Sequence, residues 1–458
     1  MSEAVPLRTV RRWWIWLGAI AASSLVIQVL SVVGRRSRVP GGDSYYYWAA
    51  ARLLVEGHGF INPFAWNQTG VHSSLMINGH MHSVVQTANW PPLFTLLLTI
   101  PHVFGLNTFF ETRLYCCVLG AGAIVLVGLA ARAIGGPRVG LVAAAVCTLN
   151  PNLWMSSDLA LSEVMTPGLV AWVLWMTWRF WKNPSWRTAI WLGLSLGVSM
   201  LGRDELALLS VLIAVPLVLL VRQATWRHRI ALLATTAALA LAVVGPWAIY
   251  NSSRFDKPVF ISSGLGVTLA SANCDATWYG ETAGYWSMPC ALASGFDPRA
   301  DESVQSGQEQ AHATKYIKAH LGDLPKVELI RLGRAFGFYK PAQQIKLDSM
   351  IETRPYHWAM VGLGFWYALL ALSLVATWVM RKRRMLLFPL WMVGLNAVCS
   401  VLLTFGNTRY RIPFEAPLGI MGAVALVWIF DRLRGRTDHG EDLAPTVPAI
   451  SARPVAAI

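Results

Sequence analysis

RRWWIWLGAIAASSLVIQVLSVVGRR, residues 11–36, is one continuous apolar run with two arginines at each end. A helix needs about 20 apolar residues to cross the hydrocarbon core of a bilayer, and residues 13–33 are enough. The run has no evident small-residue cleavage site before the next polar stretch, so we expect a spanning helix and no removable signal peptide. Similar runs recur along nearly the whole chain, which is typical of a polytopic membrane protein.

The composition supports the same class. Of the 458 residues, 55% are hydrophobic and only 14% are charged. A soluble chain of this length would need far more charge to cover its surface. The formal net charge of +14 would suit nucleic acid, but the Lys and Arg residues form short clusters between apolar runs. Membrane topology and anionic lipid headgroups explain such clusters better, so no nucleic-acid partner is expected.

The pattern of apolar runs predicts an all-α bundle of about ten transmembrane helices. One further run, 91–106, is only 16 residues long and contains Pro91, Pro92 and Pro101. We expect it to lie along the membrane surface, because it is short and interrupted for a span. The predicted spans are roughly 13–33, 112–131, 139–156, 163–181, 188–201, 205–221, 230–249, 358–380, 385–404 and 414–430.

The charges of the short loops predict the orientation of the bundle. If 91–106 does not cross the membrane, four short loops on the side of the N-terminus hold 12 basic residues and no acid. The three short loops opposite hold only Arg203, Arg409 and Arg411 as basic residues. By the positive-inside rule the first set is cytoplasmic. We therefore predict a cell-membrane protein with both termini cytoplasmic and its site on the outer, periplasmic or extracytoplasmic, face.

The expected organisation is one membrane domain, 1–435, followed by a disordered cytoplasmic tail, 436–458. The domain has two long outer segments, 34–111 and 250–357. Two interfacial helices are predicted in the first segment: one starts with Asp43 as its N-cap and the other begins at Pro91-Pro92. Residues 57–89 between them are rich in Gly, Asn and His and are predicted to form a loop.

The cysteines suggest one covalent link. Four of the six cysteines fall in predicted spans and are expected to be packing residues. Cys274 and Cys290 share the outer segment, where oxidising conditions permit a disulfide; two unpaired thiols are the alternative. The chain has no CxxC or HExxH motif and no His-rich cluster, so no metal site and no cofactor is predicted. A divalent cation is left open.

Acidic residues of the predicted outer face are the first candidates for chemistry. Asp43 is preferred, because a carboxylate at the membrane surface beside aromatic residues can act as a general base toward a hydroxyl. Capping its helix is a compatible alternative. Glu163 and Asp158 lie near the start of the fourth span, where the helix dipole favours acids in any case. Glu163 is the preferred partner of Asp43, since glycosyl chemistry uses pairs of carboxylates.

Three outer arginines are candidates for binding a phosphate group. Arg203 is the only basic residue of its loop, and Arg409 and Arg411 would point the same way if their stretch is extended. A guanidinium offers a planar fork that matches phosphate oxygens and stays ionised near lipid. The alternatives are an ion pair of Arg203 with Asp204 or Glu205, and lipid-headgroup binding by the other two.

Several short motifs, taken in order, resemble the GT-C superfamily of integral-membrane glycosyltransferases. The resemblance extends over about residues 10–430 and is strongest to the glycosyltransferase family 39-like group, with the protein mannosyltransferases and the lipid A aminoarabinose transferases. The motifs are GGDSYYYWA at 41–49, GHGF at 57–60, WPPLF at 90–94, Asn150-Pro151 followed by Ser162-Glu163, GRDE at 202–205 and RYRIP at 409–413.

The resemblance implies a GT-C-like fold and an inverting transfer of a sugar from a polyprenyl-phosphate donor to a hydroxyl acceptor at the outer face. The sugar could be a hexose or a pentose, such as mannose or arabinose, and the acceptor a glycan, a lipid or a protein. By position, Asp43 would be the catalytic base and Glu163 the second outer acid. Arg203 would take the place of a basic residue at the end of the fifth span.

The expected substrate contacts are Arg203, Arg409, Arg411, Asp158, Glu205, Asn89 and Trp90. This sequence departs from the family pattern at two positions. Asn89-Trp90 stands where relatives of the aminoarabinose type have a Lys before the Pro, and Ser44 follows Asp43 where many relatives have Glu. Only the first acid of that motif is therefore carried over.

A membrane transporter or flippase of a lipid-linked or small polar substrate is the alternative function. Transporters usually hold ionisable groups near the membrane midplane and break their helices there. In this chain the acids cluster at the ends of the predicted spans and charge within the spans is scarce. This distribution favours the enzyme.

Overall fold

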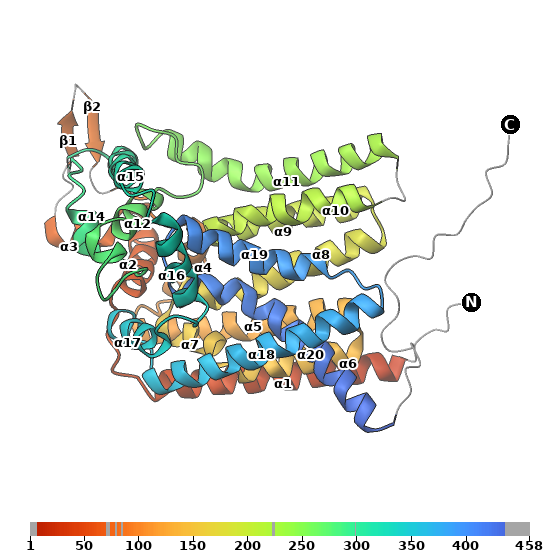
Figure 1. Ribbon diagram of the computed structural model, residues 1–458. Helices are drawn as coiled ribbons and strands as arrows, with labels where there is room; N and C mark the ends of the chain where they lie inside the picture. The colour runs from red at the N-terminus through yellow and green to blue at the C-terminus, as the bar shows by residue number, and fades with distance from the viewer. Residues whose placement is uncertain are drawn as a thin grey trace.

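The structure, a computed structural model, describes residues 7–69, 74–77, 80–83, 86–221, 225–297 and 299–435. The predicted tail, 436–458, lies outside the described residues. The long helices run side by side, and the short helices gather at one end of the bundle (Figure 1). The bundle consists of α1 (Leu7–Val33), α5 (Phe109–Gly135), α6 (Pro137–Leu149), α7 (Pro151–Leu159), α8 (Thr166–Lys182), α9 (Trp186–Gly202), α10 (Val215–Leu220), α11 (Trp226–Ser252), α18 (Tyr356–Lys382), α19 (Phe388–Leu403) and α20 (Ile412–Leu433).

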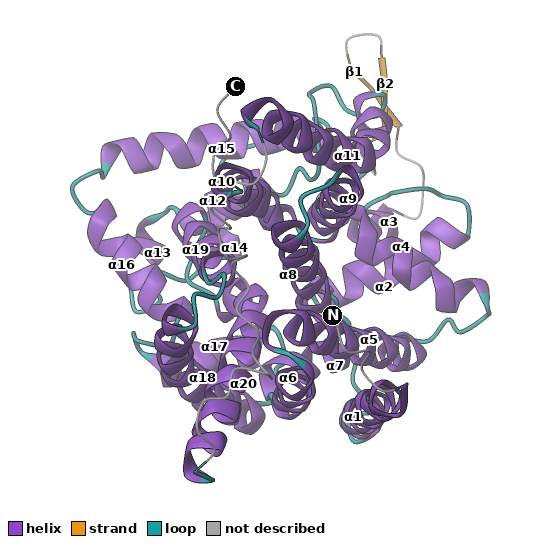
Figure 2. Cartoon of the chain, turned by 90° about the vertical axis from the view of Figure 1, so that its right-hand side faces the viewer, coloured by secondary structure: helices purple, strands orange, loops and turns teal. Residues whose placement is uncertain are grey.

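The all-α polytopic fold predicted from the sequence is confirmed, and the number of spans stays a prediction. Within the described residues, five helices are long and apolar enough to cross a membrane, or six if α6 and α7 form one span bent by 55°. Each predicted span coincides with a helical segment, but α8, α9 and α19 have only 17, 17 and 16 residues. Seen along the bundle axis, α8 lies near the centre, with α9 and α11 on one side of it and α6 and α20 on the other (Figure 2).

Small residues bring the helices close together. Gly193 and Gly197 lie one turn apart on α9, and a Cβ at Gly197 would lie 2.8 Å from the Ala240 carbonyl oxygen of α11. A side chain here would separate the two helices, so the GxxxG spacing is what permits their contact. Helix α20 is almost wholly enclosed: 83% of its apolar stretch of 18 residues is buried. Its N-terminal end, which leads into the candidate site, is therefore held rigidly.

The short elements form a cap over one end of the bundle. Helices α2 and α4 are present at the two positions where interfacial helices are predicted, and their location along the membrane surface stays a prediction. The described parts of 57–89 are less irregular than expected. Asn62 accepts hydrogen bonds from the amides of Phe64 and Ala65 and so starts a helix, and two antiparallel strands follow. The cap comprises α2 (Asp43–Val55), α3 (Pro63–Thr69), β1 (Ser74–Ile77), β2 (His80–Ser83), α4 (Pro92–Val103), α12 (Leu265–Ala272), α13 (Asp275–Trp278), α14 (Met288–Leu292), α15 (Glu302–Ala319), α16 (Leu324–Ala335) and α17 (Pro341–Ile351).

The capping role predicted for Asp43 is wrong. Asp43 is the first residue of α2, and the N-cap is Gly42, whose φ of 52° lies in the left-handed region that favours glycine. No side chain caps this helix end. The Asp43 carboxylate is therefore not used by the local backbone and is available for contacts with distant segments.

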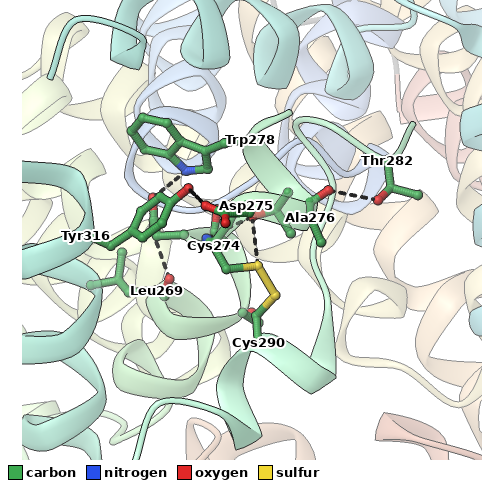
Figure 3. The surroundings of a disulfide bond; sticks show 12 residues. Leu269, Cys274, Asp275, Ala276, Trp278, Thr282, Cys290 and Tyr316 are labelled. Atoms are coloured by element: carbon green, nitrogen blue, oxygen red, sulfur yellow. Dashed lines mark hydrogen bonds between the residues drawn. A yellow bond between two sulfur atoms is a disulfide. The ribbon is translucent and has the colours of Figure 1, made fainter. Parts of the chain in front are cut away.

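A disulfide joins Cys274 and Cys290 within the second outer segment (Figure 3). The bond lies beside a polar and aromatic cluster in which the Tyr316 hydroxyl donates to Asp275 at 2.7 Å and the Trp278 indole donates to Asn273 at 3.1 Å. It links the start of α13 to α14 across a sequence separation of 16 residues. The bridge therefore ties together the segment that covers the bundle end.

Removal of this bridge is expected to destabilise the outer segment. In the chain-entropy model, cross-linking a loop of this length stabilises the folded state by about 3 kcal/mol. The double variant Cys274→Ser/Cys290→Ser should therefore unfold at a lower temperature than the wild type under oxidising conditions. Reductant should lower the wild-type midpoint and leave the variant unchanged. Equal midpoints for the two proteins without reductant would contradict this role.

Candidate active site

Four distant segments bring polar side chains together at the capped end of the bundle. Asp43 starts α2, Glu163 lies in the single turn η1 (Ser162–Val164) before α8, and Arg203 follows the last residue of α9. Arg409 lies in the turn η4 (Thr408–Arg411) that leads into α20. Each of these residues is at the end of a helix, where the backbone changes direction and a polar side chain can leave the apolar bundle.

Arg409 is the centre of the cluster. Its Nη1 lies 2.5 Å from Oδ2 of Asp43, and its Nε donates to Oε1 of Glu163. The same Nη1 is 3.9 Å from Oε1 of Glu352. One guanidinium thus holds carboxylates from three segments that are far apart in the sequence, and hydrogen bonds of this charge-assisted kind are the stronger ones in proteins.

Glu163 is shared between two arginines. Its Oε1 also lies 3.0 Å from Nη1 of Arg203, and Arg203 in turn donates from Nε to Glu205. The Glu163 side chain is 0% exposed and that of Arg203 is 9% exposed. The pairing of Arg203 with Glu205 that the sequence left open is therefore present, together with a second, fully buried partner. In such a dry environment the ion pairs interact more strongly than at the surface.

The two candidate carboxylates differ in access. The Asp43 side chain is 27% exposed, whereas Glu163 is fully enclosed by its two arginines. A solute can reach Asp43 directly, whereas Oε1 of Glu163 is already paired with both Arg203 and Arg409. This difference favours Asp43 as the group that contacts a substrate and Glu163 as the group that orients Arg203 and Arg409.

An aromatic wall lies next to the carboxylates. The rings of Tyr46 and Tyr47 lie 6.5 and 6.0 Å from that of Trp90, and Tyr47 packs edge-on against Phe94 at 4.9 Å. The Tyr47 hydroxyl is 3.5 Å from Oγ of Ser162. Burial, reinforced by nearby acids, raises the pKa of Tyr47 well above its ordinary value, so the hydroxyl keeps its proton. Trp90 thus belongs to the wall of the site.

Asn89 lies in a loop that the second outer segment holds in place. The carboxylate of Glu302 accepts hydrogen bonds from the Ala88 amide at 2.7 Å, the Thr87 hydroxyl at 2.9 Å and the Ser263 hydroxyl at 2.8 Å. The amide of Asn89 donates to Oγ1 of Thr87 at 3.1 Å. These bonds fix the chain that leads into Trp90 and α4.

Asp158 is not part of this cluster. Its side chain is 0% exposed and is paired with Arg35 and Arg38 through Oδ2 and with Arg113 at 3.0 Å through Oδ1. The carboxylate therefore joins the end of α1, the start of α5 and α7. Although Asp158 and Glu163 are close in sequence, the left-handed residue Ala160 turns the chain between them, and the two acids have different partners.

Arg411 is also separate from the cluster, because its stretch is not extended, which was the condition for Arg409 and Arg411 to point the same way. Residues Thr408–Arg411 form a 3₁₀ turn, begun by the Asn407 side chain, which accepts from the Arg409 amide at 2.9 Å. With three residues per turn, side chains two positions apart point in different directions. Arg411 lies over the Trp366 ring at 4.7 Å and donates to the Ala335 carbonyl at 3.3 Å.

Glu352 and Arg354 adjoin the site and were not among the sequence candidates. Glu352 accepts from Nδ2 of Asn407 at 3.0 Å and from Nε of Arg354 at 2.8 Å. Asp348, one turn earlier, accepts from the Thr408 hydroxyl at 2.7 Å, and burial raises its pKa to about 6. The only feature of the sequence that could have indicated these two residues is an acid and an arginine two positions apart, shortly before the span predicted at 358–380.

The residues of the cluster do not fit a metal ion. Among the described residues, no three His, Cys, Asp or Glu side chains are grouped so that they could hold one. Oδ2 of Asp43 and Oε1 of Glu163 are instead paired with the guanidinium of Arg409. No step of the chemistry is therefore assigned to a metal.

One family model matches the sequence. It describes dolichyl-phosphate-mannose-protein mannosyltransferases and matches residues 89–250, about a third of the chain. The matched region contains Glu163 and Arg203, while Asp43 and Arg409 lie outside it. Among curated proteins, no significant match is found.

One solved protein has a similar fold. The oligosaccharyltransferase of Archaeoglobus fulgidus, in complex with zinc and sulfate, is similar at a TM-score of 0.54 and 16% identity over 92% of this chain. The present chain spans about half of that protein, 50%. ArnT from Cupriavidus metallidurans, bound to undecaprenyl phosphate, is 14% identical over 90% of this chain and 77% of its own, with a TM-score of 0.41. The resemblance to GT-C glycosyltransferases expected from the sequence is confirmed.

Proposed function

Because the chain resembles GT-C glycosyltransferases in sequence and in fold, we propose that it is a membrane glycosyltransferase. It transfers a sugar from a polyprenyl-phosphate donor to a hydroxyl acceptor with inversion at the anomeric carbon. The observation that carries this proposal is Arg409 between a partly exposed carboxylate, Asp43, and a buried one, Glu163. The arrangement offers both a proton acceptor and positive charge within one cluster.

The chemistry requires two contributions from the protein. Asp43 takes the proton of the acceptor hydroxyl as its oxygen attacks the anomeric carbon. The bond between that carbon and the phosphate oxygen breaks, and its electron pair leaves with the polyprenyl phosphate. Arg203 and Arg409 stabilise the negative charge that develops on this leaving group. Glu163 holds the two guanidinium groups in position, which its full burial favours over contact with the substrate.

The proposed orientation puts this chemistry at the outer face. The N-terminal end of α1 and the C-terminal end of α20 lie at the end of the bundle away from α2 (Figure 1). The loops rich in arginine connect helices at that same end, and such loops are usually cytoplasmic. The acidic cluster then faces the periplasmic or extracytoplasmic side, where a lipid-linked sugar enters from the bilayer. The acceptor is a hydroxyl of a glycan, a lipid or a protein, and mannose-type and arabinose-type donors both fit the proposal.

The test is a transfer assay with the purified full-length protein in lipid vesicles. Polyprenyl phosphates that carry radiolabelled mannose or arabinose are supplied with glycan, lipid or peptide acceptors. The expected result is label on an acceptor, release of polyprenyl phosphate and inverted configuration at the new bond. Movement of the intact labelled donor across the vesicle membrane, without bond cleavage, would instead support the flippase alternative. No protein-dependent change of any donor would contradict both.

A further inference from the structure

Arg354 has an unused hydrogen-bond donor at the edge of the candidate site. The residue is only 4% exposed, and its Nε is bound to Oε2 of Glu352 at 2.8 Å. Its Nη2 is buried and has no hydrogen-bond partner. A buried polar group without a partner is uncommon in folded proteins and calls for an explanation. Neither Arg203 nor Arg409, the other two arginines near Glu163, has such a buried unpartnered nitrogen.

The guanidinium of Arg354 is connected to the cluster through Glu352. Oε1 of Glu352 lies 3.9 Å from Nη1 of Arg409, and the Glu352 side chain is 9% exposed. Burial lowers the pKa of Arg354, but the carboxylates of Glu352, Asp348 and Glu163 raise it more, so the pKa is above its ordinary value. Arg354 is therefore a permanent positive charge beside Arg409.

The backbone before Arg354 is held in an unfavourable conformation. Thr353 has a φ of 56°, which is rare for a β-branched residue. Arg38 maintains this conformation, because its Nη2 donates to the Thr353 carbonyl and to the Thr353 hydroxyl at 2.7 Å. Arg38 is itself fixed by Asp158. Backbone strain that is maintained by distant contacts is concentrated at functional sites, and here it directs Glu352 and Arg354.

We propose that Arg354 is a third phosphate-binding arginine, whose free Nη2 donates to an oxygen of the polyprenyl phosphate. This inference rests on the proposed function. The donor is a phosphodiester with one negative charge, and the released phosphomonoester can carry two. Arg409 forms ion pairs with three carboxylates and Arg203 with two, whereas Arg354 forms one, with Glu352, and its Nη2 is buried without a partner. Arg354 is thus suited to the additional charge of the leaving group.

Binding of undecaprenyl phosphate to the purified protein in detergent micelles tests this role. The double variant Glu352→Gln/Arg354→Gln removes both charges of this ion pair, so that Glu352 is not left as a carboxylate without its arginine. Loss of a charge-assisted hydrogen bond is expected to weaken its binding by about tenfold or more. Arg354→Lys keeps the charge but loses the fork, and should weaken binding less. The matched control Lys346→Gln removes an exposed cation of α17 and should bind as the wild type does.

The outcomes separate this inference from the proposed function. If the folded double variant binds undecaprenyl phosphate as tightly as the wild type, Arg354 does not bind the phosphate. If the double variant does not fold, wild-type affinity of Arg354→Lys leads to the same conclusion. The proposed function stands in both cases, provided that the wild type binds undecaprenyl phosphate and transfers sugar. If the wild type does neither, both proposals fail. Kinetics add a second readout, because loss of a leaving-group contact lowers kcat as well as weakening binding.

Discussion

Asp43→Asn is expected to lower the rate of sugar transfer by about 10²- to 10⁴-fold, the usual contribution of a general base. An amide has nearly the same shape as the carboxylate but does not take the proton from the hydroxyl of the acceptor. The measurement is the initial rate of label transfer in vesicles at saturating donor. Since the Asp43 side chain is 27% exposed, its ion pair with Arg409 is partly screened by solvent, and the variant should remain folded.

The control for this variant is Glu56, which directly follows the last residue of α2. Glu56→Gln makes the same change of charge at a side chain that is 46% exposed and that, among the described residues, pairs with its neighbours Arg52 and His58. It should transfer sugar at the wild-type rate. If Asp43→Asn raised KM for the donor and left kcat unchanged, Asp43 would act by orienting Arg409. A wild-type rate in folded Asp43→Asn would exclude Asp43 as the base.

Asp158→Asn is expected to destabilise the protein by about 3–5 kcal/mol, the range for breaking a buried ion pair by removal of one partner. Arg113 is 0% exposed beside a carboxylate that is also 0% exposed, and Arg38 is 11% exposed. Without the carboxylate, three guanidinium groups would face one another with no counter-charge. The measurement is the unfolding midpoint of the purified protein in detergent micelles.

Glu56→Gln is also the matched control for stability, because exposed ion pairs contribute little. Its midpoint should stay close to that of the wild type. A midpoint for Asp158→Asn equal to that of Glu56→Gln would show that the arginine cluster does not depend on Asp158. Arg38 also binds Thr353, next to Arg354. The folded fraction of Asp158→Asn should therefore bind undecaprenyl phosphate more weakly than the control does.

Much of the fold follows from local properties of the chain. Hydropathy is set by neighbouring residues, so the apolar runs were sufficient to predict the bundle helices, including 13–33 and 358–380, which are α1 and α18. Local signals also predicted α2 and α4 in the first outer segment. Residue type and position relative to the spans were enough to select Asp43, Glu163, Arg203 and Arg409 as candidates.

The partners of those candidates depend on the tertiary structure. Asp158 and Glu163 are similar acids five positions apart, yet one binds Arg35, Arg38 and Arg113 and the other binds Arg203 and Arg409. Local sequence does not distinguish them, because the contacts come from segments far away along the chain. The Asp43–Arg409 pair, for example, joins residues 366 positions apart.

The sequence alone thus determined that this chain is a helical membrane protein and that Asp43, Glu163, Arg203 and Arg409 lie outside or at the ends of its apolar runs. Only the tertiary structure decided that Arg409 lies between Asp43 and Glu163, that Arg411 is turned away by a 3₁₀ turn, and that Glu352 and Arg354 join the cluster. The physical reason is one of range. Apolar periodicity acts over a single helix, whereas ion pairs form between whichever side chains the packed helices bring within a few ångströms.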